Sequence, residues 1–441
     1  MVPHPGFRHR RLGGVDADPA RPPLARLGDR GDRQLARPGR GAASGARLLP
    51  RAPRPDLPVT AVPAPDVIPV HGTAAEPFGE LREVFARAVA AQGGGGAALA
   101  IVRDGELVVD LVGGGYAPDT LQLVFSVSKG ITGIAAAHAS SAGLLDLDEP
   151  LGAFWPEFAR PATAEITTRM VLSHRSGIAS LDRSLSFAEI IAGVGDEAVA
   201  AQDPYWEPGT RHGYHAFTYG PLMDGVFRRR LGVTVGEYLA RHITGPRAHE
   251  IWLGLPDEYA PRVAPVSYLP AAISATRAAF VAASGIPTGT TAALAREMDV
   301  YNQPELLRAG FPSTSGVASA RSLARLFAET LEGPLLDDAA RATLRTQLAR
   351  GTDAVLGVET AYSAGMQLPW PQLPWLGARS YGHEAAGGSF AFADPDAGVA
   401  VAWTTDVHPR MAGASPAGLA LVATIHHCLR SADGTEPGRH A

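Results

Sequence analysis

Lysine is almost missing from this chain of 441 residues. Lys129 is the only lysine, against 38 arginines. Arginine keeps its proton at any pH that a protein meets, whereas a lysine amine can lose its proton when it is buried or lies beside other charge. Because arginine supplies every other positively charged side chain apart from histidine, we expect that this position requires an amine, for example one that acts as a base.

Cysteine and long apolar runs are also scarce. The single cysteine, Cys428, cannot form an internal disulfide, so the sequence does not require an oxidising compartment. Its neighbours are His426 and His427 near a helix-like C-terminal segment, and we interpret it as a core residue without redox function. No stretch of 18 apolar residues occurs, which argues against a membrane span.

Charge is unevenly distributed along the chain. Residues 1–60 carry 12 Arg and 5 Asp, a net charge of +7, so the total of −5 leaves −12 on the rest. An acidic body is not expected to bind nucleic acid by electrostatics. The first segment is rich in Pro, Gly and Ala and lacks hydrophobic periodicity, so we predict that residues 1–66 are a disordered segment and linker. It is interpreted as a basic tail or as sequence upstream of the true start.

A secretion signal is not indicated in this basic segment. It contains Arg10 and Arg11, but no apolar run of about 7 to 15 residues follows them. We therefore expect a cytoplasmic protein.

Hydrophobic periodicity divides the remaining chain into strand-rich ends and a helical middle. An amphipathic helix is predicted from residue 78 to 92, followed by strands at 97–103 and 106–112 that an Asp104-Gly105 turn joins into a hairpin. Helical spacing then dominates until about residue 355. Helices are predicted at residues 129–142, 219–230, 235–242, 290–301 and 322–332, strands at 380–386, 389–393 and 399–404, and a last helix at 417–429.

This order of elements predicts an α+β fold. An antiparallel sheet assembled from both ends of the chain, flanked by helices and interrupted by an inserted, mostly helical part, explains the pattern. We expect one domain over residues 67–441, with its sheet part at about 67–125 and 356–441 and its helical part at about 126–355.

The lone lysine lies three residues after Ser126, in the sequence Ser126-Val-Ser-Lys129. On a helix, positions i and i+3 share one face, so the amine can reach the hydroxyl. A serine hydroxyl is a weak nucleophile at neutral pH and needs such a base, together with donors for the oxyanion that forms at an attacked carbonyl. Ser-x-x-Lys also occurs by chance, so partners must be found elsewhere.

Two further segments supply candidate partners. Tyr214 is predicted in a loop between a Pro-Gly turn and the helix that begins near residue 218, and its phenol could act as a base if Lys129 stabilised the phenolate. His383 lies on a predicted strand that continues into Gly387 and Gly388. Glycine in a strand often marks the close approach of a ligand or another backbone. An ordinary loop tyrosine and a structural strand histidine are the alternatives.

Together, in this order, the segments resemble the serine beta-lactamase and penicillin-binding-protein superfamily, and most closely its family VIII carboxylesterases. The resemblance covers residues 68–430. It rests on Ser126-Val-Ser-Lys129, Leu144-Leu-Asp-Leu-Asp-Glu-Pro150, Leu172-Ser-His-Arg-Ser-Gly177, Trp206-Glu-Pro-Gly209, Gly213-Tyr214-His215, and Gly382-His383 with Gly387-Gly388.

The resemblance implies a beta-lactamase/DD-peptidase-like fold and a role for each segment. Ser126 would be acylated, and Lys129 and Tyr214 would share the general-base and general-acid work. The strand of His383, with Gly387 and Gly388, would line the opposite wall of the site. The N–H of Ser126 and that of Ala386 would hold the oxyanion. No cofactor and no metal are implied.

The sequence departs from the superfamily at two places. Lactamases and peptidases of this group usually carry Tyr-x-Asn and Lys/His-Thr-Gly, whereas the corresponding residues here are Tyr214-His215-Ala216 and His383-Glu384-Ala385. A site without the amide of Asn should favour peptide-like substrates less. We therefore predict a carboxylesterase for small acyl esters, with a beta-lactamase or acyltransferase on the same scaffold, or an inactive ligand-binding or sensor domain, as alternatives.

Three other patterns carry less weight. No Gly-x-Ser-x-Gly occurs, which argues against an alpha/beta-hydrolase. His212 and His215 lack an evident third ligand, so no metal site is predicted. Ser173 and Ser176 lie close to His174 in sequence, but adjacent residues seldom face each other, and a structural role is preferred.

The sequence leaves the natural ester and the oligomeric state open, and the pocket walls are expected near residues 180–200 and 257–312.

Overall fold

The computed structural model describes residues 68–268, 284–287, 298–373, 375–408 and 415–432. They belong to one compact unit, Pro63–Ala441. The predicted segment 1–66 lies outside the described residues, as do residues 290–297 of one predicted helix.

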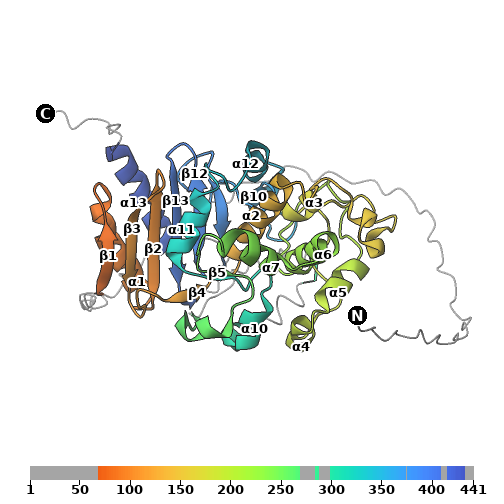
Figure 1. Cartoon of the computed structure of the whole chain (residues 1–441), viewed down its shortest axis with the longest axis horizontal. Helices are drawn as coiled ribbons and strands as arrows, with labels where there is room; N and C mark the ends of the chain where they lie inside the picture. Colours follow the sequence, from red (N-terminus) through yellow and green to blue (C-terminus); the bar gives the residue numbers. More distant parts are fainter. Residues whose placement is uncertain (1–67, 269–283, 288–297, 374, 409–414, 433–441) are drawn as a thin grey trace, which may run out of the picture. The chain divides into compact units, whose positions relative to one another are not determined.

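A six-stranded antiparallel sheet forms the frame of this unit (Figure 1). Its strand order, β1-β3-β2-β13-β12-β11, brings the two ends of the chain together, because β2 pairs with β13 along its whole length. The predicted α+β architecture is confirmed. The strands are β1 (Val70–Ala74), β2 (Ala97–Arg103), β3 (Glu106–Gly113), β11 (Tyr381–Glu384), β12 (Phe390–Asp394) and β13 (Val399–Thr405).

The two faces of the sheet differ in side-chain size because residues alternate along each strand. In β13, Val401 and Trp403 face a core with the outer helices α1 (Leu81–Ala91) and α13 (Pro416–Ala432). Ala400 and Ala402 belong to the other core, on the side of α11 (Ala320–Ala328). Small side chains on that face allow the inner helices to lie close to the sheet.

Helix α2 (Val127–Ser141) lies against β11 and against the segment between β10 and β11. A Cβ added at Gly130 would lie 3.2 Å from the Cβ of His383, and one at Gly133 would lie 2.8 Å from the Cα of Gly365. Since a side chain at Gly133 would collide with backbone, this glycine permits the approach of the helix. The start of α2 is thereby placed beside the strand of His383.

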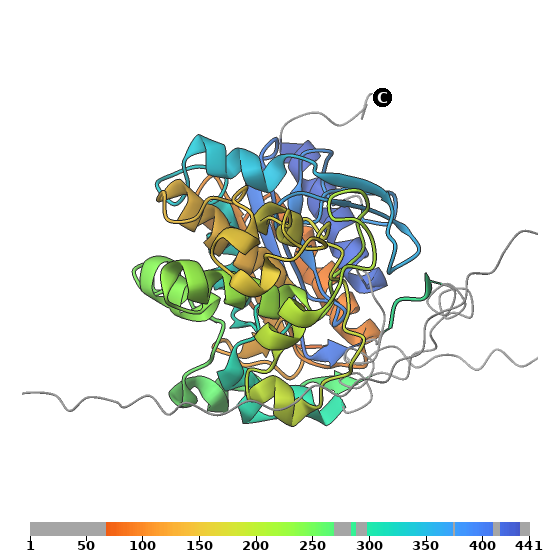
Figure 2. The same ribbon diagram turned by 90° about the vertical axis from the view of Figure 1, so that its right-hand side faces the viewer.

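The helical part faces the viewer in Figure 2, with strands of the sheet behind it. The predicted helices at 219–230 and 235–242 are found as α6 (Tyr219–Leu231) and as α7 (Val235–Leu239) followed by a π-helical turn, η4 (Ala240–Thr244). The other helices of the described residues are α3 (Thr168–Leu172), α4 (Phe187–Ile191), α5 (Gly195–Ala201), α10 (Pro304–Ala309) and α12 (Asp338–Arg345), with the 3-10 helices η1 (Phe78–Glu80), η2 (Leu151–Ala153), η3 (Pro156–Phe158), η5 (Asp257–Arg262) and η6 (Met298–Asn302).

Short strands that the sequence analysis did not predict occur within and beside this part of the chain. Each has two to four residues, which is too short for a visible alternation of polar and apolar side chains. They form small sheets, β5-β8-β4-β6, β10-β9 and β14-β7. The bounds are β4 (Leu121–Leu123), β5 (Ile251–Trp252), β6 (Val263–Ala264), β7 (Ser267–Tyr268), β8 (Val317–Ala318), β9 (Ala349–Thr352), β10 (Glu359–Tyr362) and β14 (Val407–His408).

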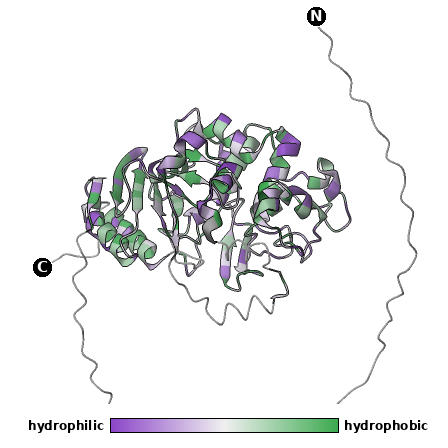
Figure 3. Cartoon of the chain, turned by 90° about the horizontal axis from the view of Figure 1, so that it is seen from below, coloured by the Kyte–Doolittle hydropathy of each residue, from purple (hydrophilic) through white to green (hydrophobic). Residues whose placement is uncertain are grey.

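Hydrophilic residues interrupt the hydrophobic ones along the helices (Figure 3). Among the residues that the structure describes, no helix has both the length and the apolar character needed to cross a bilayer.

Candidate active site

Ser126 stands where strand β4 turns into helix α2. The preceding residue, Phe125, has φ of +45°, a conformation that costs free energy in a non-glycine residue and persists only when packing enforces it. Its ring contacts Tyr301 and His408, at centroid distances of 5.0 and 4.8 Å. A Cβ at Gly387 would lie only 2.9 Å from this ring. Packing around Phe125 thus fixes the turn that presents the half-buried Ser126.

The amine of Lys129 is fully buried and has three oxygen neighbours. Its Nζ lies 3.3 Å from the Ser126 hydroxyl, 3.1 Å from the Ala216 carbonyl and 2.8 Å from the Ser313 carbonyl. Burial lowers the pKa of Lys129 well below its usual value. In its neutral form the amine would donate its two N–H groups to the two carbonyls, and its lone pair would then face the Ser126 hydroxyl.

Tyr214 completes a group of three side chains. Its phenol hydrogen-bonds the Ser126 side chain, and the Lys129 Nζ lies 4.8 Å from its ring centroid. The ring of Tyr362 stacks on that of Tyr214 with centroids 6.4 Å apart and an angle of 17° between the planes, and His174 packs against it at 4.9 Å. The structure therefore brings together Ser126, Lys129 and Tyr214.

The environment keeps the Tyr214 phenol protonated. Burial is the largest influence and raises its pKa, the hydrogen bond with Ser126 lowers it, and the negative charges of Glu384 and Asp353 raise it further. Burial also lowers the pKa of Lys129, which weakens the amine as the cation that the sequence-based hypothesis of a Tyr214 phenolate needs. This geometry suits a phenol that donates a proton and an amine that accepts one.

His383 lies on β11, next to the start of α2, and is buried. Its Nδ1 donates a hydrogen bond to the Glu384 carbonyl over 2.6 Å. Burial, and secondarily the charge of Lys129, lower the pKa of His383 to about 3, although this hydrogen bond raises it. The ring is therefore neutral near pH 7, with a lone pair on Nε2 that no hydrogen bond satisfies within the described part of the chain.

The predicted oxyanion donor, Ala386, belongs to a turn and not to the strand itself. The turn follows β11 and is closed by hydrogen bonds from Ala385 N–H to the Ser389 carbonyl and from Gly388 N–H to the Ala385 carbonyl, both 2.9 Å. Gly388 has φ of +84°, which favours glycine. No hydrogen bond among the described residues uses the Ala386 N–H. Because Gly387 contacts the ring of Phe125, this turn lies against the residue before Ser126.

The segment around Ser176 supports the Tyr214 loop. The Ser176 hydroxyl bonds His215 Nε2 over 2.7 Å, and His215 Nδ1 donates to the Gly213 carbonyl over 2.6 Å. His174 Nδ1 accepts the backbone N–H of His215 over 3.1 Å. Ser176 and His215 are completely buried, which leaves no room for a substrate carbonyl at this serine.

The remaining candidate residues also have protein partners. Ser173 donates its hydroxyl to the Arg169 carbonyl, and His212 Nε2 bonds the Thr360 hydroxyl over 3.0 Å. His212 and His215 thus each use a ring nitrogen for structure. Of the expected pocket walls, Ser180 and the segment 284–287 meet, because the Ser180 hydroxyl donates to the Pro287 carbonyl.

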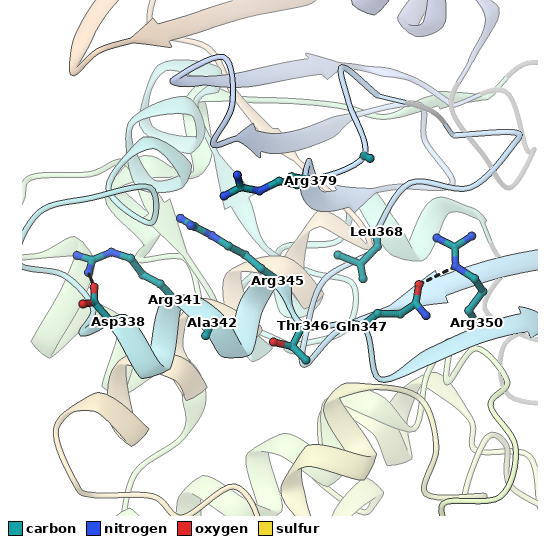
Figure 4. Close-up of a pocket in the computed structure, with 10 residues that line it drawn as sticks. Asp338, Arg341, Ala342, Arg345, Thr346, Gln347, Arg350, Leu368 and Arg379 are labelled. Carbon is teal, nitrogen blue, oxygen red and sulfur yellow. Dashed lines mark hydrogen bonds and ion pairs between the residues drawn. The ribbon is translucent and has the colours of Figure 1, made fainter.

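An arginine-lined pocket of about 500 Å³ lies elsewhere, between α12, the start of β9 and the segment before β11 (Figure 4). Its guanidinium groups already have partners in the protein. Arg341 bonds Asp338 and the Gly333 carbonyl, Arg345 bonds the carbonyls of Thr330 and Leu331, Arg350 bonds Gln347, Glu359 and the Pro369 carbonyl, and Arg379 pairs with Asp396. We assign the pocket no part in the chemistry at Ser126.

A serine at a strained helix start, beside a buried lysine amine and within an α+β fold of this topology, defines a serine hydrolase. The chain belongs to the Beta-lactamase family, which matches residues 81–424.

Similar proteins include esterases and a penicillin-binding-protein homologue. Esterase/beta-lactamase LipL of Mycobacterium tuberculosis is 30% identical over 368 residues, which is 78% of this chain and 83% of that protein. The crystal structure of a family VIII carboxylesterase is 25% identical, with a TM-score of 0.74 over 82% of this chain and 100% of that one. A penicillin-binding-protein homologue from Caulobacter crescentus is 31% identical, with a TM-score of 0.71 over the same shares.

Proposed function

We propose that this protein is a serine carboxylesterase that hydrolyses short-chain or small acyl esters through an acyl-enzyme on Ser126. One observation carries the proposal: the buried Lys129 Nζ lies 3.3 Å from the Ser126 hydroxyl, while the carbonyls of Ala216 and Ser313 hold the amine at 3.1 and 2.8 Å. Such an amine is oriented to take the hydroxyl proton.

Acylation follows from these positions. As the Ser126 oxygen bonds to the ester carbonyl carbon, its proton passes to Lys129. The negative charge on the carbonyl oxygen is stabilised by the N–H groups of Ser126 and Ala386. Collapse of the tetrahedral intermediate breaks the bond to the alcohol, whose oxygen takes the phenol proton of Tyr214, and Tyr214 regains a proton from the Lys129 ammonium.

Deacylation repeats the sequence with water. Lys129, neutral again, accepts a proton as water attacks the acyl carbon, and the Ser126 oxygen leaves with a proton supplied through Tyr214. His383, Gly387 and Gly388 form the opposite wall, where the neutral His383 ring offers an acceptor and no positive charge.

The residues favour an ester over an amide. The position two after Tyr214 is Ala216, so the site lacks the Asn side chain of the Tyr-x-Asn motif. A buried site that offers no partner to a peptide-like amide discriminates against it. The similarity to a family VIII carboxylesterase and to EstA from Arthrobacter nitroguajacolicus, 28% identical, supports the same choice. The substrate proposed is a small-molecule ester.

A beta-lactamase is the second candidate, because a relative that is 30% identical over 78% of this chain is named Esterase/beta-lactamase. Rates with p-nitrophenyl butyrate and nitrocefin, measured side by side, separate the two. Efficient turnover of nitrocefin without turnover of short esters would refute the carboxylesterase. An excess of acceptor alcohol in the ester assay would reveal acyl transfer.

The test of the mechanism itself is covalent labelling. A fluorophosphonate should modify the wild type at one site, and Ser126→Ala should abolish the label while Ser176→Ala leaves it in place. A wild type that neither reacts with the reagent nor cleaves esters would instead be a ligand-binding domain on the same fold.

A further inference from the structure

The buried carboxylate of Asp353 binds the backbone of the loop that carries Tyr214. Asp353 is completely inaccessible to solvent. Its Oδ1 accepts three backbone N–H groups, those of Val355 and Leu356 over 2.8 Å each and that of Tyr214 over 3.1 Å. The first two close the turn between β9 and β10, as aspartates often do two and three residues ahead. The third bond reaches a residue 139 positions away.

The second oxygen of the same carboxylate holds the ring that stacks on Tyr214. Asp353 Oδ2 accepts the phenol of Tyr362 over 3.4 Å and the hydroxyl of Thr360 over 3.3 Å. Tyr362 lies nearly parallel to the Tyr214 ring. One carboxylate therefore fixes Tyr214 at two points, through its backbone and through its stacking partner.

The turn at residues 353–355 packs closely against the loop that carries Tyr214. Ala354 N–H donates to the His212 carbonyl over 3.0 Å, next to the Tyr214 bond. A Cβ at Gly213 would lie 2.9 Å from the Val355 side chain and 2.8 Å from the Trp206 ring. Movement of the 353–355 turn would therefore move the backbone that carries Tyr214.

We propose that Asp353 is a positioning residue that holds the Tyr214 phenol in reach of Ser126. The inference rests on the proposed function, since it assigns Asp353 an effect on the reaction through Tyr214. An error of about 1 Å in the placement of a reacting group can cost about 100-fold in rate. In addition, the negative charge of Asp353 raises the pKa of Tyr214, which helps to keep the phenol protonated.

Asp394 provides a matched control within the chain. It is 2% exposed, its Oδ1 accepts the N–H groups of Asp396 and Ala397 over 2.9 Å each, and its Oδ2 accepts the Ser380 hydroxyl. This is the local arrangement of Asp353 without the bond to Tyr214. Asp394 closes the turn after β12, at the end of that strand away from the Ala386 turn.

The experiment compares Asp353→Ala, Asp353→Asn and Asp394→Ala, each alone and combined with Tyr214→Phe. Thermal unfolding, kcat and KM with p-nitrophenyl butyrate, and the rate of Ser126 labelling by a fluorophosphonate are measured. Asp353→Ala should lower kcat and the labelling rate by about 10- to 100-fold with little change in KM. Asp353→Asn should recover most of the loss, because its amide oxygen still accepts the three N–H groups.

If Asp353 acts through the Tyr214 phenol, the effects of Asp353→Ala and Tyr214→Phe on the rate should not be additive. In the Tyr214→Phe background, where the phenol is already gone, Asp353→Ala should cost less than about 3-fold. Asp394→Ala should lower stability with little effect on kcat. Should Asp353→Ala not fold, Asp353→Ser serves in its place, since a serine hydroxyl can close the same turn but is too short to reach Tyr214.

Two results would overturn the inference. One is an equal loss from Asp353→Ala with and without the Tyr214 phenol. The other is a loss of kcat no larger than that of Asp394→Ala. A wild type that labels at Ser126 but ignores p-nitrophenyl butyrate would contradict the ester substrate alone, and the labelling rates would still decide the role of Asp353. A wild type that does not label removes both proposals.

Discussion

The Nζ atom of Lys129 lies 3.1 Å from the carbonyl oxygen of Ala216. Ala216 occupies the place of Asn in the Tyr-x-Asn motif of lactamases and peptidases, so a main-chain acceptor holds the amine although the amide side chain is missing. The departure from the motif removes a side-chain group from the site without removing a partner of the lysine. This combination is what the proposed preference for esters over amides requires.

Replacement of the lysine tests the need for an amine. Lys129→Arg keeps a positive charge, but a guanidinium stays protonated and cannot accept the Ser126 proton. We expect esterase activity to fall by more than 10-fold, a loss of at least about 1.4 kcal/mol in transition-state stabilisation, in a protein that circular dichroism shows to be folded. A variant with more than a tenth of the wild-type kcat/KM would show that the lone lysine is incidental.

The turn beside Phe125 is expected to tolerate no side chain. Gly387→Ala places a Cβ 2.9 Å from the Phe125 ring and should shift both the Ala386 N–H and the turn that presents Ser126. We expect kcat to fall by about 10- to 100-fold. The control is Gly115→Ala, where the nearest atom is 3.8 Å away. Equal activity of the two variants would mean that the turn does not contribute to the oxyanion site.

The pH dependence of the rate should reveal the base. The lowered pKa of Lys129 means that the amine loses its proton at a pH well below that of an ordinary lysine, so kcat/KM should rise with pH through this value and then level off. Because the pKa of Tyr214 is raised, no descending limb from the phenol is expected near neutral pH. A rate that rises only where a free lysine titrates would contradict a neutral Lys129.

Stability should fall as the pH drops from about 6.5, the usual value for histidine. Burial lowers the pKa of His215 to about 4 and that of His383 to about 3. Between these values and 6.5, each of the two histidines binds a proton in the unfolded chain but not in the folded protein. Each therefore lowers the unfolding free energy by up to about 1.4 kcal/mol for every unit by which the pH falls. Denaturant titrations from pH 7 to 4 measure the slope.

A variant assigns part of that slope to one residue. His215→Gln should reduce the slope by up to about 1.4 kcal/mol per pH unit, the contribution of one proton. An unchanged slope in His215→Gln would mean that His215 is protonated in the folded protein.

The sequence predicts much of the frame because its long elements carry clear periodicity. The strands around the Asp104-Gly105 turn and the last helix agree with the predictions within about three residues at each end. The grouping of Ser126, Lys129 and Tyr214 also follows from sequence, since their motifs come in a recognisable order. The short strands β5 to β8 were missed because two residues cannot show a period.

Residues that bind Lys129 through their main-chain carbonyl groups could not be predicted from the sequence. The carbonyl groups of Ala216 and Ser313 bind Lys129 whatever side chains those residues carry. Asp353 is one acidic residue among 44 and lies 139 positions from Tyr214, so only the folded chain brings the two together. The raised pKa of Tyr214 argues against the hypothesis of a Tyr214 phenolate, and the environment that raises it cannot be read from a motif.

Since the only lysine of the chain is buried at the start of α2, no other side chain offers a primary amine to a chemical reagent. Acylating or imine-forming reagents that select side-chain amines can react only inside the proposed catalytic centre. The amount of side-chain amine modified in the native protein therefore measures how often this centre opens to solvent, and protection by a bound ester analogue would report occupancy without any engineered label.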